Sequence, residues 1–307
     1  MSQLSLYAMP GNAGRAAAIA AALQGRFEVV LGSCRVHRFP DGESLLQLDP
    51  PQSAPQAVLV CSLNDPDVKT VQLLMAADTL RELGATCVGL VAPYLAYMRQ
   101  DIRFAPGQAV SAGLYAGLLS AHFDWLLTVD PHLHRIHDLG QVYTMQSRVL
   151  AAAPRLADWI RDHVEQPLII GPDGESEQWA AAVAQRVGAP LLVMRKVRSG
   201  DFDVSSSIPD LQRYPGRTPV LLDDIISSGR TLVAALDHLR QAAAAPAVCV
   251  AVHGLFAADA LPALRAAGAA RIVCTDSTDS ALAATGVEIV SLSADLGAAI
   301  PELLSAS

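Results

Sequence analysis

The stretch VLLDDIISSGRTL at residues 220–232 holds the residue types best suited to chemistry. Its apolar run 220–222 predicts a buried strand, and Asp223 and Asp224 at the strand end could accept hydrogen bonds from two neighbouring sugar hydroxyls. A turn and a helix start follow, built from Ser227, Ser228, Gly229 and Thr231. Such a turn presents backbone N–H groups and hydroxyls at the positive end of a helix, which suits a phosphate monoester. The stretch predicts a sugar-phosphate site, although an acid pair that only caps a helix would use the same residues.

Short apolar runs alternate with Ala- and Leu-rich helical stretches along the whole chain, which is typical of α/β proteins with parallel sheets. One predicted helix, 68–83, carries an apolar face formed by Val71, Leu74, Met75, Leu80 and Leu83. The predicted strands are 57–61, 86–91, 125–129, 168–171, 191–194, 220–222, 247–253, 271–274 and 288–290.

Two similar blocks are present, and in each a strand ends on an aspartate in a polar turn. Asp130 follows the strand at 125–129, as Asp223 follows the strand at 220–222. We interpret this as a tandem duplication of one α/β unit with its junction near 146–155.

The composition indicates which kinds of partner and which cellular compartment to expect. The 307 residues include 22 basic and 30 acidic side chains, a net charge of −8, so no general attraction to nucleic acid or to acidic membranes is expected. No apolar run is long enough for a membrane helix, and no secretory leader precedes the first predicted strand. The five cysteines are scattered and favour buried free thiols over disulfides or a thiolate metal site. A cytoplasmic enzyme is expected.

The segment FPDGES at 39–44 could bind a nucleobase. Phe39 could stack on the base, while the carboxylates of Asp41 and Glu43 could accept from its exocyclic amine. A plain surface turn would have the same residues.

Basic and polar residues follow the strand at 86–91. Arg99 and Gln100, with Arg103 nearby, could meet a triphosphate. A solvated charged loop is the alternative interpretation.

Two further strand ends carry candidate metal ligands. His132, His134 and His137 follow the strand at 125–129, and three histidines could bind zinc, but no Cys or Glu accompanies them at zinc-site spacing. We favour one imidazole, His132, near a hard metal ion or a phosphate. The turn after 168–171 bears Asp173, Glu175 and Glu177, whose oxygens suit Mg²⁺.

The stretch at 220–232 closely resembles the signature of the type I phosphoribosyltransferase fold, and the chain as a whole resembles the ribose-phosphate pyrophosphokinases. The family motif F-x-D-G-E matches residues 39–43, and its Pro-Tyr…Arg-Gln-Asp matches Pro93, Tyr94, Arg99, Gln100 and Asp101. Its D-x-H matches Asp130 and His132, its Pro-Asp turn matches Pro172 and Asp173, and its Lys-x-Arg matches Lys196 and Arg198.

The resemblance implies two tandem phosphoribosyltransferase-like domains, 1–147 and 148–307, each with a mainly parallel sheet flanked by helices. The first would carry the ATP-side motifs without a ribose-phosphate loop, and the second would hold ribose 5-phosphate. Arg99, Gln100 and His132 would face the ATP phosphates, and His132 and Asp173 would serve the Mg²⁺ cofactor. Phe39, Asp41 and Glu43 would reach the adenine from a neighbouring subunit, so a homo-oligomer, a dimer or a multiple of dimers, is expected. Ribose 5-phosphate would be bound by Asp223, Asp224, Ser227, Ser228, Gly229 and Thr231.

The implied reaction is attack of the anomeric hydroxyl of ribose 5-phosphate on the β-phosphorus of ATP, with release of AMP. Lys196 and Arg198 would be the catalytic cations that stabilise charge during transfer. Two features depart from the family: Ser227 stands where an acidic residue is usual, and Arg230 where a small one is usual. A second interpretation is a phosphoribosyltransferase that consumes the product of this reaction. Many such enzymes use the acidic residue of this loop as a general base, so its absence favours a synthetase. The third interpretation, a catalytically silent regulator, is disfavoured by the presence of Lys196, Arg198, His132 and Asp173.

Overall fold

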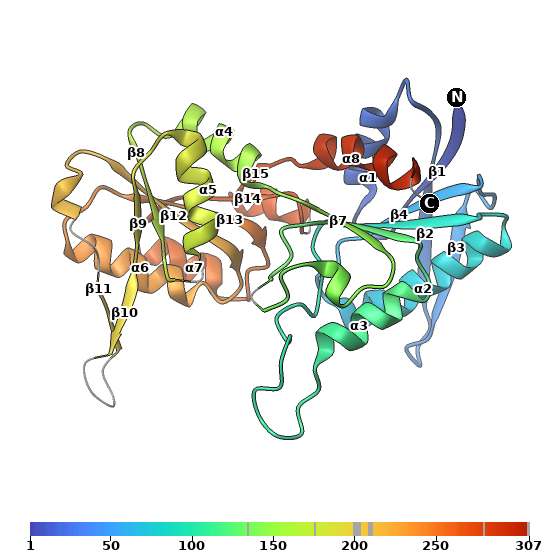
Figure 1. Cartoon of the computed structure of the whole chain (residues 1–307), viewed down its shortest axis with the longest axis horizontal. Coiled ribbons are helices and arrows are strands. Elements are labelled where there is room, and N and C mark those ends of the chain that lie inside the picture. Colours follow the sequence, from blue (N-terminus) through green and yellow to red (C-terminus); the bar gives the residue numbers. More distant parts are fainter. Residues whose placement is uncertain (134, 175, 199–203, 208–210, 279, 306–307) are drawn as a thin grey trace. The chain divides into compact units, whose positions relative to one another are not determined.

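The chain forms two compact units, shown in Figure 1 in a computed structural model that describes all residues except 134, 175, 199–203, 208–210, 279 and 306–307. Unit 1 comprises Met1–Leu150, Ser277–Ser280 and Leu292–Ser307. Unit 2 comprises Ala151–Asp276 and Ala281–Ser291. Both units are α/β, with mainly parallel sheets flanked by helices.

Unit 1 is built on a sheet with the strand order β3-β2-β1-β4-β5-β6-β7, in which β2 and β3 are antiparallel and the other neighbours are parallel. Helices α2 and α3 cover one face of the sheet, and α1 and α8 cover the other (Figure 1). Its elements are β1 (Ser2–Ala8), α1 (Ala13–Leu23), β2 (Phe27–Arg38), β3 (Ser44–Asp49), β4 (Gln56–Val60), α2 (Pro66–Glu82), β5 (Cys87–Ala92), α3 (Ser111–Ser120), β6 (Trp125–Val129), η1 (Leu139–Gln141), β7 (Gln146–Leu150) and α8 (Ser293–Ser305).

Unit 2 is built on a parallel sheet with the order β15-β14-β13-β12-β8-β9, and β10 and β11 form a separate antiparallel pair. Helices α4 and α5 pack together, as do α6 and α7. Its elements are α4 (Ala153–His163), β8 (Pro167–Gly171), α5 (Glu177–Val187), β9 (Leu191–Val193), β10 (Arg195–Arg198), β11 (Val204–Ser207), η2 (Leu211–Arg213), β12 (Thr218–Ile226), α6 (Arg230–Gln241), β13 (Ala247–Gly254), α7 (Ala260–Ala266), β14 (Ala269–Thr275), η3 (Ser280–Thr285) and β15 (Glu288–Val290).

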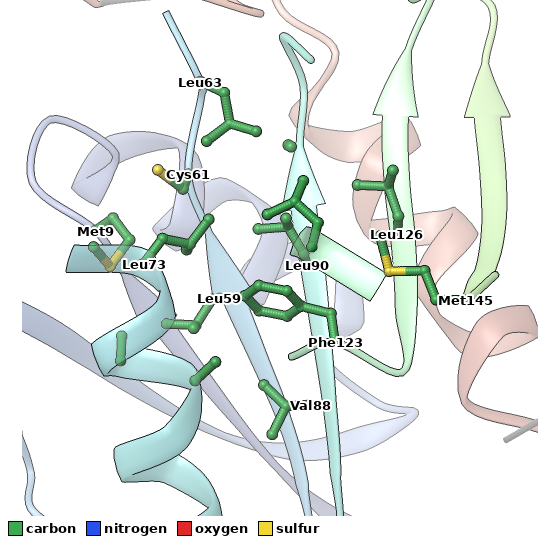
Figure 2. Close-up of a cluster of buried hydrophobic side chains, with 14 of the residues drawn as sticks. Met9, Leu59, Cys61, Leu63, Leu73, Val88, Leu90, Phe123, Leu126 and Met145 are labelled. Carbon is green, nitrogen blue, oxygen red and sulfur yellow. The ribbon is translucent and has the colours of Figure 1, made fainter. Parts of the chain in front are cut away.

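The core of unit 1 lies between its sheet and the α2–α3 layer. Figure 2 shows the ring of Phe123 among Leu59, Val88 and Leu90, which come from neighbouring strands. These side chains are almost wholly buried. The central strands read as continuous apolar runs because they are covered on both faces, and they therefore hold the loops at their ends in fixed places.

The apolar face predicted for the 68–83 helix is wrong in part. Helix α2 buries Leu73, Ala76, Ala77 and Leu80, whereas Val71 is 55% exposed and Met75 is 41% exposed. The buried face of α2 includes the small Ala76 and Ala77, which let the helix lie close to the sheet. The larger apolar residues Val71 and Met75 lie on a different face of the helix. An apolar stripe consequently faces away from the core.

The division into units differs from the predicted domains 1–147 and 148–307. The first boundary lies at 150/151, and residues 292–307 return to unit 1. Helix α8 packs against α1, where a Cβ on Gly297 would lie 2.6 Å from the Cβ of Ala22. Arg148 of β7 donates to the carbonyl of Ala299 at 3.3 Å and pairs with Glu302. The packing of α8 on α1 and its bonds to Arg148 make this helix part of unit 1.

Two sequence-based expectations bear on the compartment. All five cysteines are described, and each is a buried free thiol, as predicted. Within the described residues, none of the helices has the length and apolarity that crossing a membrane would require.

Candidate active site

The predicted sugar-phosphate loop joins β12 to α6 in unit 2. The strand is longer than predicted: it runs to Ile226, so Asp223 and Asp224 lie within it, and Asp223 pairs in register with Ala251 of β13. The loop then closes onto the segment after β13, where the carbonyl of Ser227 accepts from the N–H of Ala257 at 2.9 Å. The strand is extended because β13 continues beside it beyond the point where pairing with β8 ends.

The loop ends in the first turn of α6. Gly229 precedes the helix with a φ of 69°, a left-handed conformation that glycine adopts without a Cβ penalty. The helix starts at Arg230, one residue before the predicted Thr231, and the side chains of Ser228, Arg230 and Thr231 are exposed. The first N–H groups of a helix have no partner within it, so this turn can bind an anion.

Three carboxylates gather at the carboxyl ends of β8 and β12. Burial, and then the negative charges of Asp224 and Asp173, raise the pKa of Asp223 to about 8. Asp173 is fixed in the turn before α5, because its Oδ1 accepts from the N–H of Ser176 at 3.1 Å and its carbonyl accepts from the Ser176 hydroxyl at 2.7 Å. Because neighbouring negative charges raise this pKa, a bound cation or donating sugar hydroxyls would stabilise the group of carboxylates.

The predicted base-binding turn connects β2 to β3 at one side of the unit 1 sheet. The N–H of Phe39 donates to the carbonyl of Glu43 at 2.8 Å, and the N–H of Glu43 donates to Asp41 Oδ1 at 3.1 Å. Gly42 has a φ of 94°, which the tight turn requires. Phe39 is 39% exposed and contacts His37 edge to face, with ring centroids 4.9 Å apart. The turn presents an aromatic ring and two exposed carboxylates to solvent.

The predicted triphosphate residues follow neighbouring parallel strands. Arg99 and Gln100 come after β5, and His132 comes after β6, whose Val129 N–H donates to the carbonyl of Pro93 at 3.2 Å. The structure therefore brings the two loops to the same edge of the unit 1 sheet. It does not bring the Phe39 turn beside them, because β1 and β4 separate β2 from β5 by about 14 Å at the usual strand spacing.

The two predicted catalytic cations lie on β10 in unit 2. Lys196 pairs in register with Ser206 of β11, and Arg198 pairs with Val204. The intervening Ser199 and Gly200 lie outside the described residues. The antiparallel pairing of β10 with β11 gives the backbone of these described residues a regular extended form.

The predicted metal ligands belong to different units, His132 to unit 1 and Asp173 to unit 2. Among the described residues, no group of three or more His, Cys, Asp or Glu could hold a metal ion, and His134 and Glu175 lie outside them. Mg²⁺ is usually held by one or two carboxylates together with substrate phosphates and water, so it needs no such group. Asp173, Asp223 and Asp224 supply carboxylate oxygens, the kind of donor that this ion prefers.

One contact in unit 1 was missed from sequence. Arg135, three residues after His132, forms an ion pair with Asp101, the residue after Gln100. The two side chains are 34 residues apart in the chain, so no local spacing indicates the contact.

The chain is similar to known protein families in both its N-terminal and its C-terminal part. Residues 4–122 match the N-terminal domain of ribose phosphate pyrophosphokinase, and residues 141–290 match the phosphoribosyl transferase domain. A ribose-phosphate pyrophosphokinase of Methanopyrus kandleri is 34% identical over 78% of this chain and 81% of its own length. One from Halobacterium salinarum is 34% identical over 87% of this chain and 92% of its own. The crystal structure of phosphoribosylpyrophosphate synthetase from Mycobacterium smegmatis has the same fold, with a TM-score of 0.85, 22% identity and complete coverage of both chains.

Proposed function

This chain belongs to the ribose-phosphate pyrophosphokinase family, and we propose that it transfers the diphosphate group of ATP to the anomeric hydroxyl of ribose 5-phosphate. The observation that carries the proposal is the loop of unit 2, where Asp223 and Asp224 precede an exposed helix start within a few residues. A sugar phosphate needs both parts at this spacing. The phosphate would accept from the first N–H groups of α6, and the ribose hydroxyls would donate to the carboxylates.

The proposed assignment of each residue follows this geometry. Ser227, Ser228, Gly229 and Thr231 bind the 5-phosphate, and Asp223 and Asp224 bind the ribose hydroxyls. Arg99, Gln100 and His132 bind the ATP phosphates. Their position at one edge of the unit 1 sheet supports this assignment.

In the proposed reaction the anomeric oxygen bonds to the β-phosphorus, the bond from that phosphorus to the α,β-bridging oxygen breaks, and AMP leaves. The hydroxyl proton passes to solvent. Lys196 and Arg198 stabilise the negative charge that spreads over the phosphoryl oxygens. Bound Mg²⁺ would supply further charge neutralisation, and the proposed protein ligands are Asp173 in unit 2 and His132 in unit 1, each considered within its own unit.

We also propose a homo-oligomer in which the Phe39 turn serves a neighbouring subunit. Two observations support it: the turn is far from the Arg99 and His132 loops of its own sheet, and an exposed apolar surface lies on α2 and α3. This surface, here the α2–α3 patch, consists of Val68, Val71, Met75, Leu114 and Leu118, all at least 40% exposed. Apolar patches of this kind mark interfaces.

The proposed compartment is the cytoplasm, where thiols stay reduced, and the free cysteines support it. A net charge of −8 gives no support for a nucleic-acid partner.

The decisive experiment incubates the protein with ATP, ribose 5-phosphate and Mg²⁺ and follows AMP and the sugar diphosphate by phosphorus NMR. We expect both products in equal amounts, and neither when ribose 5-phosphate is omitted. Absence of both at every Mg²⁺ concentration would refute the proposal. Release of pyrophosphate from phosphoribosyl diphosphate with a nucleobase, without ATP, would instead support a phosphoribosyltransferase, and substrate binding without turnover would support a regulator.

A further inference from the structure

A buried carboxylate and an exposed guanidinium join the two loops proposed to bind the ATP phosphates. Nη1 of Arg135 lies 3.0 Å from Oδ1 and 3.4 Å from Oδ2 of Asp101. The Asp101 side chain is 5% exposed, whereas that of Arg135 is 54% exposed. The two partners therefore differ in solvent exposure: the Asp101 carboxylate is shielded from water, whereas the Arg135 guanidinium is solvated.

The two residues belong to different loops at one edge of the unit 1 sheet. Asp101 follows Arg99 and Gln100 in the loop after β5, and Arg135 follows His132 in the loop after β6. Arg135 also lies over the ring of Phe104, 5.8 Å from its centroid, so it contacts the first loop twice. Within that first loop Arg103 Nε donates to the carbonyl of Gln108 at 2.8 Å, and the N–H of Ala112 in α3 donates to the carbonyl of Gln100 at 3.2 Å. The start of the loop has other contacts in unit 1: the Tyr97 hydroxyl donates to Asp67 of α2, and the Pro93 carbonyl accepts from the N–H of Val129.

The unequal burial decides what the ion pair does. An ion pair between two exposed side chains stabilises a protein very little. A carboxylate that has lost its water is different, because removing its partner leaves a buried charge without compensation. Asp101 would then turn toward water and move the neighbouring Gln100 and Arg99. Its negative charge would also lie beside a triphosphate with no cation to offset it.

We propose that Arg135 is a positioning residue for the diphosphate donor: it holds Asp101 in place and thereby sets Arg99, Gln100 and His132 for the phosphates of a nucleoside triphosphate. The inference rests on the proposed function, since it concerns the same site. It predicts an effect on the nucleotide side of the reaction and none on the sugar-phosphate side, which lies in unit 2.

The test compares Arg135→Gln with Arg81→Gln. Arg81 also forms an ion pair in unit 1, with Asp124, a residue that precedes β6 and so lies at the other edge of the sheet. We expect Arg135→Gln to raise KM for ATP and the Kd of Mg²⁺-bound ATP by about tenfold, with kcat and KM for ribose 5-phosphate within about twofold of the wild type. Arg81→Gln should leave all four values unchanged. Arg135→Lys should recover part of the loss, because it restores the charge but not the planar guanidinium that lies over Phe104.

A double variant separates positioning from simple charge loss. In Asp101→Asn/Arg135→Gln no buried charge is left, so its Kd for ATP should be closer to the wild type than that of Arg135→Gln alone. An unchanged ATP Kd and KM in an Arg135→Gln protein with wild-type thermal stability would overturn the inference. Equal losses for ATP and ribose 5-phosphate would overturn it too, because they indicate general disruption. A wild type that binds ATP but forms no AMP would refute the proposed function, while the ATP Kd values would still test the role of Arg135.

Discussion

Leu221 of β12 pairs in parallel register with Ile170 of β8, and the strand ends that follow therefore lie side by side. This pairing brings Asp223 and Asp173 to the same edge of the unit 2 sheet although they are 50 residues apart in the chain. Burial and the charge of Asp224 are the larger causes of the raised pKa of Asp223, and the charge of the nearby Asp173 adds to them.

The first prediction concerns stability against pH in the free protein. The pKa of Asp223 is raised from 3.8 to about 8, so between these values the folded state binds a proton that the unfolded state has lost. The free energy of unfolding should consequently fall as pH rises through this window and level off above it. Asp223→Asn removes the titrating group and should remove that slope, a gain at pH 8 relative to pH 5 on the order of a few kcal/mol.

Urea unfolding at pH 5 and pH 8 measures this difference. Asp237→Asn is the control, because Asp237 is a carboxyl on α6 that pairs with Arg240 in the same unit. The control should keep the wild-type slope. An Asp223→Asn variant with that same slope would show that the Asp223 carboxyl is ionised in the folded state at neutral pH.

A second prediction tests the left-handed residue before α6. Gly229→Ala places a Cβ at a φ of 69°, which should cost about 1 kcal/mol of stability and distort the N–H groups proposed to bind the 5-phosphate. We expect KM for ribose 5-phosphate to rise about tenfold. Gly188→Ala is a matched control in the same unit, with a φ of 72° and nothing within 4 Å of the added Cβ. Gly188→Ala should lose a similar amount of stability without a change in KM for ribose 5-phosphate. A comparable rise in KM in this control would show that the effect does not depend on the loop before α6.

A third prediction concerns charge stabilisation. Lys196→Ala should lower kcat by about two to three orders of magnitude while ribose 5-phosphate still binds, because the cation is proposed to act mainly in the transition state. Steady-state AMP release and equilibrium binding of ribose 5-phosphate measure the two effects. Arg186→Ala, which removes an exposed cation from α5 in the same unit, is the control. Unchanged turnover in Lys196→Ala would exclude this residue from the reaction.

A fourth prediction tests the α2–α3 patch. Leu114 is 69% exposed, so Leu114→Glu should leave the fold intact and separate the proposed subunits. Sedimentation velocity should show a smaller species, and KM for ATP should rise because no neighbour supplies Phe39. Val149→Glu changes another exposed apolar residue of unit 1, on β7 outside the patch, and should not alter the mass. A Leu114→Glu protein of wild-type mass would remove the patch from any interface.

Most strands covered on both faces could be predicted from the sequence, because burial favours continuous apolar runs. Each run predicted as a strand is one, and the run at 220–222 lies inside β12. The antiparallel pair β2 and β3 was missed, since its strands are at one side of the sheet and have exposed residues such as Arg35 and Gln47. Strands β1, β7, β10 and β11 were missed as well, and in β1 the polar Ser5 interrupts the apolar run. The fold class was confirmed because it depends on the central strands.

Long-range contacts are the part of the site that the sequence did not predict. The loop at 220–232 is a local motif, and its acid pair, turn and helix start lie within a few residues of one another. The Arg135–Asp101 ion pair forms because β5 and β6 are neighbours in the sheet, and the order of strands in a sheet could not be predicted from this sequence. The face of α2 was predicted wrongly for a related reason: a hydrophobic pattern shows which residues are apolar, and not whether a sheet or another subunit covers them.

The last prediction tests whether α8 belongs to unit 1 in solution. A Cβ on Gly297 would lie 2.6 Å from the Cβ of Ala22 and 3.0 Å from the carbonyl oxygen of Ile19 in α1, so Gly297→Ala must push the two helices apart. We expect a loss of about 2 kcal/mol in the free energy of unfolding, measured in urea, because close-packed backbones relax poorly. Gly14→Ala is the control within α1, where nothing lies within 4 Å of the added Cβ and alanine favours a helix. Equal stability of the two variants would mean that α8 does not pack on α1. Residues 292–307 would then not belong to unit 1, and unit 1 would end near residue 150.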